Sequence, residues 1–265
     1  MHPVREGLLL ATGLTAMCRR ALASPPLVSY SLVVDRRDGV SERETRGGTT
    51  GAYTEYLSYN WPTLLGEAVG QVAVVAVALV AAMAVALALG VYAYRRERLA
   101  NVMLSVASAA LTLPSLALFG LMIPLFGIGA LPTVVVLLIY ALMPILRNII
   151  TGLQGVDPAI LEAAAGVGMT AWRRLVVVEI PLAWPVILAG LRFSTMMIVG
   201  VAAVGAYVGG PGLGTTLFNG LEEIGSPAAV PEVVVATGAI LVLALLMDAL
   251  LAGLARLSVS RGIRD

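Results

Sequence analysis

Long apolar runs that contain no charged residue dominate the chain. The charge-free runs are Ala68–Tyr94, Leu99–Leu146, Phe193–Leu221 and Val233–Met247. An α-helix needs about 20 apolar residues to cross the hydrocarbon core of a bilayer, so the first run is long enough for one crossing and the second for two. The pattern predicts an all-α fold, a polytopic bundle of membrane helices.

Five membrane spans are predicted, because clusters of Pro and Gly interrupt the apolar runs. The expected spans are about Leu65–Tyr94, Ala100–Ile123, Leu131–Ile150, Pro185–Val208 and Pro231–Ala255. We expect these five core helices to form a transmembrane domain over residues 61–256, with a long polar loop at 151–184. Residues 1–60 are expected to be an amino-terminal extension, poorly ordered or interfacial, and residues 257–265 a cytoplasmic tail. A signal peptide is an alternative interpretation of the extension.

Composition agrees with a membrane protein. Apolar residues make up 59% of the chain and charged residues 12%, with a mean hydropathy of +0.93, whereas soluble domains carry about 25% charged residues. A net charge of +1 provides no attraction to nucleic acid. With one Cys and one His, a Cys/His zinc site is excluded. We therefore expect no metal site and no cofactor.

The arginines indicate the orientation of the spans. Alternate loops contain arginines, namely Arg95, Arg96 and Arg98, then Arg173 and Arg174, then Arg256, Arg261 and Arg264. The intervening loops, 124–131 and 209–231, contain no basic residue. Because cytoplasmic loops are enriched in Lys and Arg, the pattern predicts that the loop at 151–184 and the carboxyl terminus face the cytoplasm.

The loop at 151–184 contains signals for two short helices outside the bilayer. Asp157 and Pro158 form a strong helix start, since Asp can cap free backbone N–H groups and Pro is tolerated in the first turn. Gly166 and Gly168 should end this first helix. Thr170 can cap a second helix, which we expect to run through about Val178 and to stop at Pro181.

This loop resembles the EAA loop of bacterial ABC importer permeases. The resemblance lies in Glu162-Ala163-Ala164, then three residues, then Gly168, and then a run that ends at Val178-Glu179-Ile180-Pro181. In that family the loop is the coupling helix, which docks into a groove on a cytoplasmic ATPase. The resemblance implies that Glu162, Ala163, Ala164, Gly168 and Pro181 are ATPase-coupling residues.

Other segments resemble the quaternary-ammonium osmoprotectant branch of the same family, which imports glycine betaine, choline and carnitine. They are Leu113–Gly120, Ile123–Gly129, Leu142–Asn148, Val156–Pro158 and Gly209–Gly214. The resemblance implies a permease subunit of a bacterial cell membrane, without a catalytic site of its own. It also implies four kinds of partner, namely cytoplasmic ATPase subunits, a second permease subunit, an extracytoplasmic solute-binding protein and the lipid bilayer.

Alternative functions remain open from the sequence. Within the transport class, the solute could be methionine or an oxyanion, since the EAA loop is shared broadly. A different class, an ion-coupled carrier or a channel, is disfavoured because the spans contain no series of carboxylates for a proton relay. An intramembrane enzyme is disfavoured because the sequence presents no nucleophile–base or metal-ligand cluster.

Two ionisable residues lie well inside the apolar runs. Arg192 in the fourth span and Asp248 in the fifth both lie about seven residues from the inner ends, about 10 Å deep at 1.5 Å per residue. Charges in membranes usually pair or line a wet path. We therefore predict an ion pair near an inner gate, the alternative being that each residue snorkels or lines a vestibule separately. Pro114, Ser115 and Asn148 are candidates for the translocation path, and a free carbonyl could arise at a Pro114 kink.

Overall fold

The computed structural model describes residues 42–226 and 228–258, and side chains from residue 51 onward. The chain divides into two units, Met1–Thr45 and Arg46–Asp265. Of the first unit, only the beginning of one helix is described. The predicted extension therefore falls mainly outside the described residues, as does the tail after Ser258, and residues 42–60 are helical.

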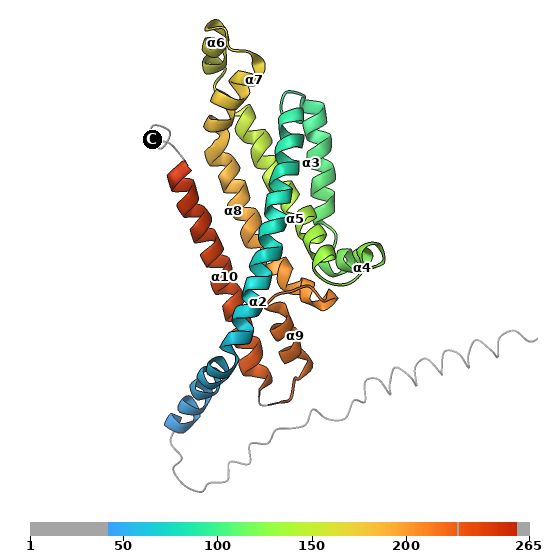
Figure 1. Cartoon of the computed structure of the whole chain (residues 1–265), viewed down its shortest axis with the longest axis vertical. Coiled ribbons are helices and arrows are strands. Elements are labelled where there is room, and N and C mark those ends of the chain that lie inside the picture. Colours follow the sequence, from blue (N-terminus) through green and yellow to red (C-terminus); the bar gives the residue numbers. More distant parts are fainter. Residues whose placement is uncertain (1–41, 227, 259–265) are drawn as a thin grey trace, which may run out of the picture. The chain divides into compact units, whose positions relative to one another are not determined.

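The described part of the second unit is built from helices (Figure 1). Their bounds are α2 Glu42–Ala93, α3 Glu97–Leu111, α4 Ser115–Phe126, α5 Ala130–Gln154, α6 Pro158–Gly166, α7 Ala171–Arg174, α8 Ile180–Gly205, α9 Gly214–Glu222 and α10 Ala229–Ser258. A π-helical segment, η1 (Leu175–Glu179), joins α7 to α8, and a single 3-10 turn, η2 (Ala206–Val208), follows α8. Helix α9 lies in the Gly-rich stretch that the sequence analysis treated as a loop.

Four continuous helical stretches are long and apolar enough to cross a membrane: 51–93, 130–154, 171–208 and 229–258. A fifth span results if the bent pair α3–α4 counts as one. The predicted membrane bundle is therefore confirmed, with five spans if the bent pair is one of them. The span predicted at about Ala100–Ile123 differs from the structure, because α3 and α4 meet at 96° instead of forming one kinked helix.

Pro114 explains the break between α3 and α4. It has no N–H to donate, and its ring disfavours a helical conformation at Leu113. In an α-helix the missing N–H of Pro114 would leave the Ala110 carbonyl free, but here that carbonyl accepts from the Leu113 N–H. The Tyr140 hydroxyl, from α5, donates to the Leu113 carbonyl. The free carbonyl predicted from the sequence is therefore not at Ala110 or at Leu113.

The fourth span also differs from the prediction, because the helix does not stop at Pro181. Residues 171–208 form one helical stretch that passes through η1. In η1 the Ile180 N–H bonds to the Leu175 carbonyl, five residues back. This wider turn accommodates Pro181, which in an α-helix would clash with the carbonyl four residues earlier. The second short helix of the loop is thus the beginning of the fourth span.

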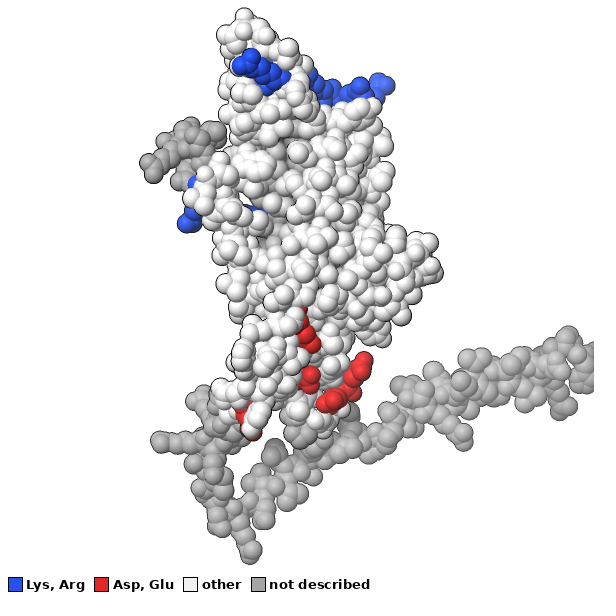
Figure 2. Space-filling model, viewed as in Figure 1, with Lys and Arg blue, Asp and Glu red and all other residues white. Residues whose placement is uncertain are grey.

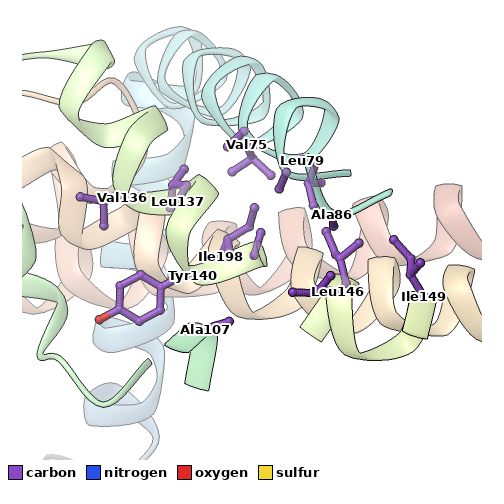
Figure 3. Packing of buried hydrophobic residues seen from close by; sticks show 14 of the residues in the cluster. Val75, Leu79, Ala86, Ala107, Val136, Leu137, Tyr140, Leu146, Ile149 and Ile198 are labelled. Atoms are coloured by element: carbon purple, nitrogen blue, oxygen red, sulfur yellow. The ribbon is translucent and has the colours of Figure 1, made fainter. Parts of the chain in front are cut away.

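Helices α2, α5 and α8 supply most of the core. Residues of α2 spaced three and four apart are buried on one face, namely Val75, Ala78, Leu79, Ala82 and Ala86. Small side chains on a membrane helix permit close approach of its neighbours. Figure 3 shows Val75, Leu79 and Ala86 in the same cluster as Leu137, Leu146 and Ile149 of α5 and Ile198 of α8.

A buried glutamine holds the loop that follows η2. Gln71 of α2 is fully buried, donates through Nε2 to the Val199 carbonyl at 3.0 Å, and accepts through Oε1 from the Leu213 N–H at 2.9 Å. Gly212 has φ +153 and approaches Gln71 so closely that a Cβ would lie 2.9 Å from Oε1. The loop therefore requires both the amide of Gln71 and a glycine at 212.

Charged residues are unevenly distributed over the helix bundle (Figure 2). On the face shown, most basic residues lie at the end that carries α6, α7 and the α2–α3 junction, others lie beside the end of α10, and acidic residues lie toward the end near α9. Arg95 and Arg96 belong to that junction and Arg98 to the first turn of α3, whereas Glu222 ends α9 and Glu223 follows it. This separation agrees with the predicted orientation, since the basic end is the one expected in the cytoplasm.

Gly214→Ala should destabilise the packing of α9 against α8. A Cβ at Gly214 would lie 1.9 Å from the Ala203 carbonyl oxygen, and overpacking of this kind costs roughly 1–3 kcal/mol. We expect a lower apparent melting temperature in detergent, measured by size-exclusion chromatography of samples heated to increasing temperatures. Gly238→Ala in α10 is the matched control, because a Cβ there meets nothing within 4 Å. A Gly214→Ala protein that melts at or above the wild-type temperature would contradict this packing.

Candidate functional site

The candidate coupling site is the elbow formed by residues 157–174, which comprises α6, α7 and the turn between them. The predicted caps are confirmed, since the Asp157 carboxylate accepts from the Ala159 N–H at 2.8 Å and the Thr170 hydroxyl from the Arg173 N–H at 3.3 Å. Gly168, between the helices, has φ +82. Only glycine adopts that conformation without strain, so the local sequence accounts for the sharp turn.

Most of the elbow is exposed, and its exposed face includes large apolar side chains. Val167 is 75% exposed and Trp172 71% exposed. Apolar surface of this kind, at one end of the bundle and bordered by charges, is typical of an interaction site. Figure 1 shows α6 and α7 at one end of the bundle, beyond α8 and α5.

The structure separates the five predicted coupling residues into three groups. Glu162, Ala163 and Gly168 are exposed on the elbow. Ala164 is buried, and its carbonyl accepts from the Met169 N–H at 3.2 Å, so it supports the turn instead of presenting surface. Pro181 lies in the first turn of α8, outside the elbow.

An ion-pair cluster around one buried carboxylate lies at the base of the elbow, and it was not predicted from the sequence. Glu179, the last residue of η1, has a fully buried side chain. Its Oε1 accepts from Arg95 Nη2 at 2.9 Å and from Arg174 Nε at 3.2 Å. One sequence feature could have indicated this cluster, namely the single carboxylate, Glu179, in the otherwise apolar run from Leu175 to Ile180.

The structure brings Arg192 of α8 and Asp248 of α10 together. Arg192 Nε donates to Oδ1 and Nη2 to Oδ2, both at 2.8 Å. This is the two-pronged arrangement that gives guanidinium–carboxylate pairs their strength and fixed geometry. The Arg192 side chain is 41% exposed and the Asp248 side chain 19%. Trp184 Nε1 donates to Ser258 Oγ at 3.0 Å, which links the same two helices a second time.

The three candidate path residues do not lie together. Pro114 and Ser115 lie at the α3–α4 break, beside the Tyr140 contact. Asn148 lies eight residues beyond Tyr140 in α5, about 12 Å along the helix. Its amide donates to the Pro144 carbonyl at 2.8 Å, and its side chain packs on Gly190 of α8.

Within residues 42–226 and 228–258, no group of three or more His, Cys, Asp or Glu could hold a metal ion. The acidic end near α9 contains Glu67, whose carboxylate accepts from the Thr216 hydroxyl at 2.6 Å.

Burial, followed by the neighbouring Glu179 carboxylate, raises the pKa of Tyr94 to about 12. Tyr94 therefore remains protonated beside the Glu179 cluster at physiological pH.

Comparison with known proteins identifies the class. Residues 78–258 match the family described as "Binding-protein-dependent transport system inner membrane component". The chain belongs to this family of membrane permeases, and it is a multi-pass membrane protein.

Individual relatives carry narrower names. The chain is 42% identical to the osmoprotectant import permease protein OsmW of Salmonella typhimurium, over 80% of this chain and 94% of that protein. It is 38% identical to the glycine betaine/carnitine/choline permease protein OpuCB of Bacillus subtilis, over 63% of this chain and 77% of that protein. A chain of the inward-facing MetNI methionine ABC transporter shares the fold, with a TM-score of 0.62 and 20% identity over 77% of this chain and 97% of that one.

Exchanging the charges of Arg192 and Asp248 should test whether the pair stabilises the bundle. Arg192→Asp or Asp248→Arg alone places two like charges together between apolar helices, and an uncompensated charge there costs about 2.5–3.5 kcal/mol on the insertion scale. We expect each single variant to lower the yield of folded protein and its apparent melting temperature. The double variant should recover much of both. If the double variant is no better than either single variant, the pair does not stabilise the fold.

Proposed function

We propose that this chain is the membrane permease subunit of an ATP-driven importer of quaternary-ammonium compatible solutes of the glycine betaine, choline and carnitine type. The observation that carries the proposal is the 42% identity to an osmoprotectant import permease, over 80% of this chain and 94% of the relative. A relative matched over nearly its whole length has the same spans and loops available for solute passage. OpuCB, named for glycine betaine, carnitine and choline, supports the same solute class.

The proposed subunit has no catalytic site of its own, and a separate pair of cytoplasmic ATPase subunits hydrolyses ATP. The exposed elbow around Glu162, Ala163 and Gly168 is the surface on which an ATPase subunit docks. Its small and apolar side chains permit close approach, while its charges fix the register against a partner. A second permease subunit completes the path, and a solute-loaded extracytoplasmic binding protein docks at the acidic end near α9.

The continuous helix from α7 through η1 to α8 provides a direct mechanical route. ATP-driven closure of the ATPase pair displaces the elbow, and α8 moves with it because 171–208 is one helical stretch. Arg192 on α8 transmits this movement to Asp248 on α10, and in this proposal the pair lies at the inner gate. Pro114, Ser115 and Asn148 stay candidates for contact with the solute along the path.

Other solutes are less well supported. The MetNI chain is named for methionine, but at 20% identity it is evidence for the fold alone. An ion-coupled carrier or a channel would not need the exposed elbow, and the family description refers to binding-protein-dependent transport.

Uptake of labelled solutes tests the proposed substrate class. The chain, co-expressed with its ATPase, its second permease subunit and its binding protein, should restore uptake of glycine betaine, choline or carnitine to cells that lack such systems. Labelled methionine should not be taken up above background. Uptake of methionine without any quaternary-ammonium solute would contradict the proposal.

Glu162→Lys and Gly168→Asp should abolish uptake while the protein still inserts into the membrane. Glu162 is exposed, so its reversal alters the docking surface without changing the core. At Gly168 the side chain adds strain at φ +82, roughly 1–2 kcal/mol for an L-residue. The measurements are solute uptake, membrane-fraction yield and copurification of the ATPase.

Glu223→Lys, a charge reversal on an exposed residue at the opposite end of the bundle, is the matched control for docking. It should leave ATPase copurification at the wild-type level. Wild-type uptake by both elbow variants would remove the coupling role from this segment.

A further inference from the structure

Glu179 has a buried side chain with no role in the transport cycle proposed above, and one of its two carboxylate oxygens lacks a hydrogen-bond partner. Among the described side chains, Glu179 Oε2 is the one buried polar atom without a hydrogen-bond partner. The other oxygen, Oε1, accepts from both Arg95 and Arg174. Burial of a carboxylate costs free energy that pairing must offset, so this side chain is held in place by the two arginines and not by solvation.

The two arginines come from different parts of the molecule. Arg95 lies two residues after the end of α2, in the α2–α3 junction, and Arg174 ends α7 in the elbow. A further hydrogen bond attaches the end of α5 to the same region, because Gln154 Nε2 donates to the Tyr94 carbonyl at 2.9 Å. The ends of α2 and α5 are thereby tied to the base of the elbow.

The π-helical turn is what makes this arrangement possible. Arg174 and Glu179 are five residues apart, and in an α-helix such residues point about 140° away from each other. The wider turn of η1, with its bond from Ile180 to Leu175, brings their side chains within 3.2 Å. Irregular turns of this type inside helices frequently occur at functional sites.

An open groove of about 210 Å³ lies between α2 and the elbow, and it is lined by Val91, Tyr94, Arg95, Ala171, Trp172 and Leu175. At the base of this groove the ion pair between Arg95 and Glu179 is a direct attachment of the elbow to the basic end of α2.

We infer that Glu179 is a positioning residue that makes the elbow and the adjacent end of α2 move as one body. The inference rests on the proposed function, in which an ATPase displaces the elbow. Displacement then reaches α8 through the continuous helix and α2 through the Arg95–Glu179–Arg174 cluster. Two of the main core helices receive the movement together, and loss of the cluster leaves α8 moving without α2.

Glu179→Gln should uncouple transport from ATP hydrolysis in the complete complex. The amide keeps the size of the side chain but removes the charge that holds both arginines. We expect the amount of solute transported per ATP hydrolysed to fall about ten-fold. This lies within the roughly 5- to 150-fold changes in affinity that coupling between two sites typically produces. Hydrolysis stimulated by the loaded binding protein should persist. A purely structural role would lower both activities together, in proportion to the amount of assembled complex.

Arginine variants keep the test decisive if Glu179→Gln folds poorly. Arg95→Lys preserves the charge and should retain most of the coupling, whereas Arg95→Gln should lose it. Arg96→Gln is the matched control, since the Arg96 guanidinium lies over the Tyr92 ring, 4.7 Å from its centroid. Equal transport per ATP in Arg95→Gln and Arg96→Gln would overturn the inference.

A distance measurement separates failure of this inference from failure of the proposed function. Spin labels at Arg98→Cys, in the first turn of α3, and at Val176→Cys, an exposed position of η1 outside the docking surface, in a Cys18→Ser background, report the separation of the α2–α3 end and the base of the elbow. One narrow distance, the same with and without ATP, is expected in the otherwise wild-type complex and a broadened one in Glu179→Gln. Unchanged distances in Glu179→Gln would overturn the inference. This readout needs no solute, so an error in the assigned solute class appears in the uptake assay alone.

Discussion

The structure depends on one constraint, that a backbone in lipid must satisfy its hydrogen bonds internally. Continuous helices do this by themselves, and each interruption requires a particular repair. At the Pro114 break the Tyr140 hydroxyl donates to the Leu113 carbonyl. At Pro181 a π-helical turn replaces an α-helical one. After η2, Gln71 bonds to the Val199 carbonyl and the Leu213 N–H. Two polar side chains in the apolar runs, those of Tyr140 and Gln71, therefore hold irregular segments.

The same constraint applies to charged side chains. An isolated charge in an apolar span is costly, and two sets of charged residues in the described helices form ion pairs that join separate helices. Arg192 and Asp248 join α8 to α10. Glu179 joins the base of the elbow to the end of α2 through Arg95. The remaining charges on the face shown lie mainly at the two ends of the bundle (Figure 2), basic at the elbow and acidic near α9.

Together these attachments suit the proposed function, in which the permease is driven from outside the bilayer. Under that proposal, the exposed apolar and small residues of the elbow meet an ATPase subunit, while the base of the elbow is anchored through a continuous helix and a buried carboxylate. A displaced elbow would then move whole helices as rigid elements instead of bending one loop. The chain's membership of the binding-protein-dependent permease family is the reason for expecting such an external drive.

Local sequence determined the features that depend on near neighbours along the chain. The apolar runs predicted the membrane helices, and Asp157 and Thr170 predicted the starts of α6 and α7. Arg192 and Asp248 are 56 residues apart, and their pairing was predicted from a different signal, their equal depth in two membrane spans. The 96° bend at Pro114 was not predicted. A proline in a helix is compatible with either a kink or a full break, and the choice depends on contacts from other helices, such as that of Tyr140. Passage of the helix through Pro181 depended on a π turn that no local signal indicates. The Glu179 cluster required partners 84 residues apart in the chain, and only the tertiary structure, which places the end of α2 beside the base of the elbow, brings them within hydrogen-bond distance.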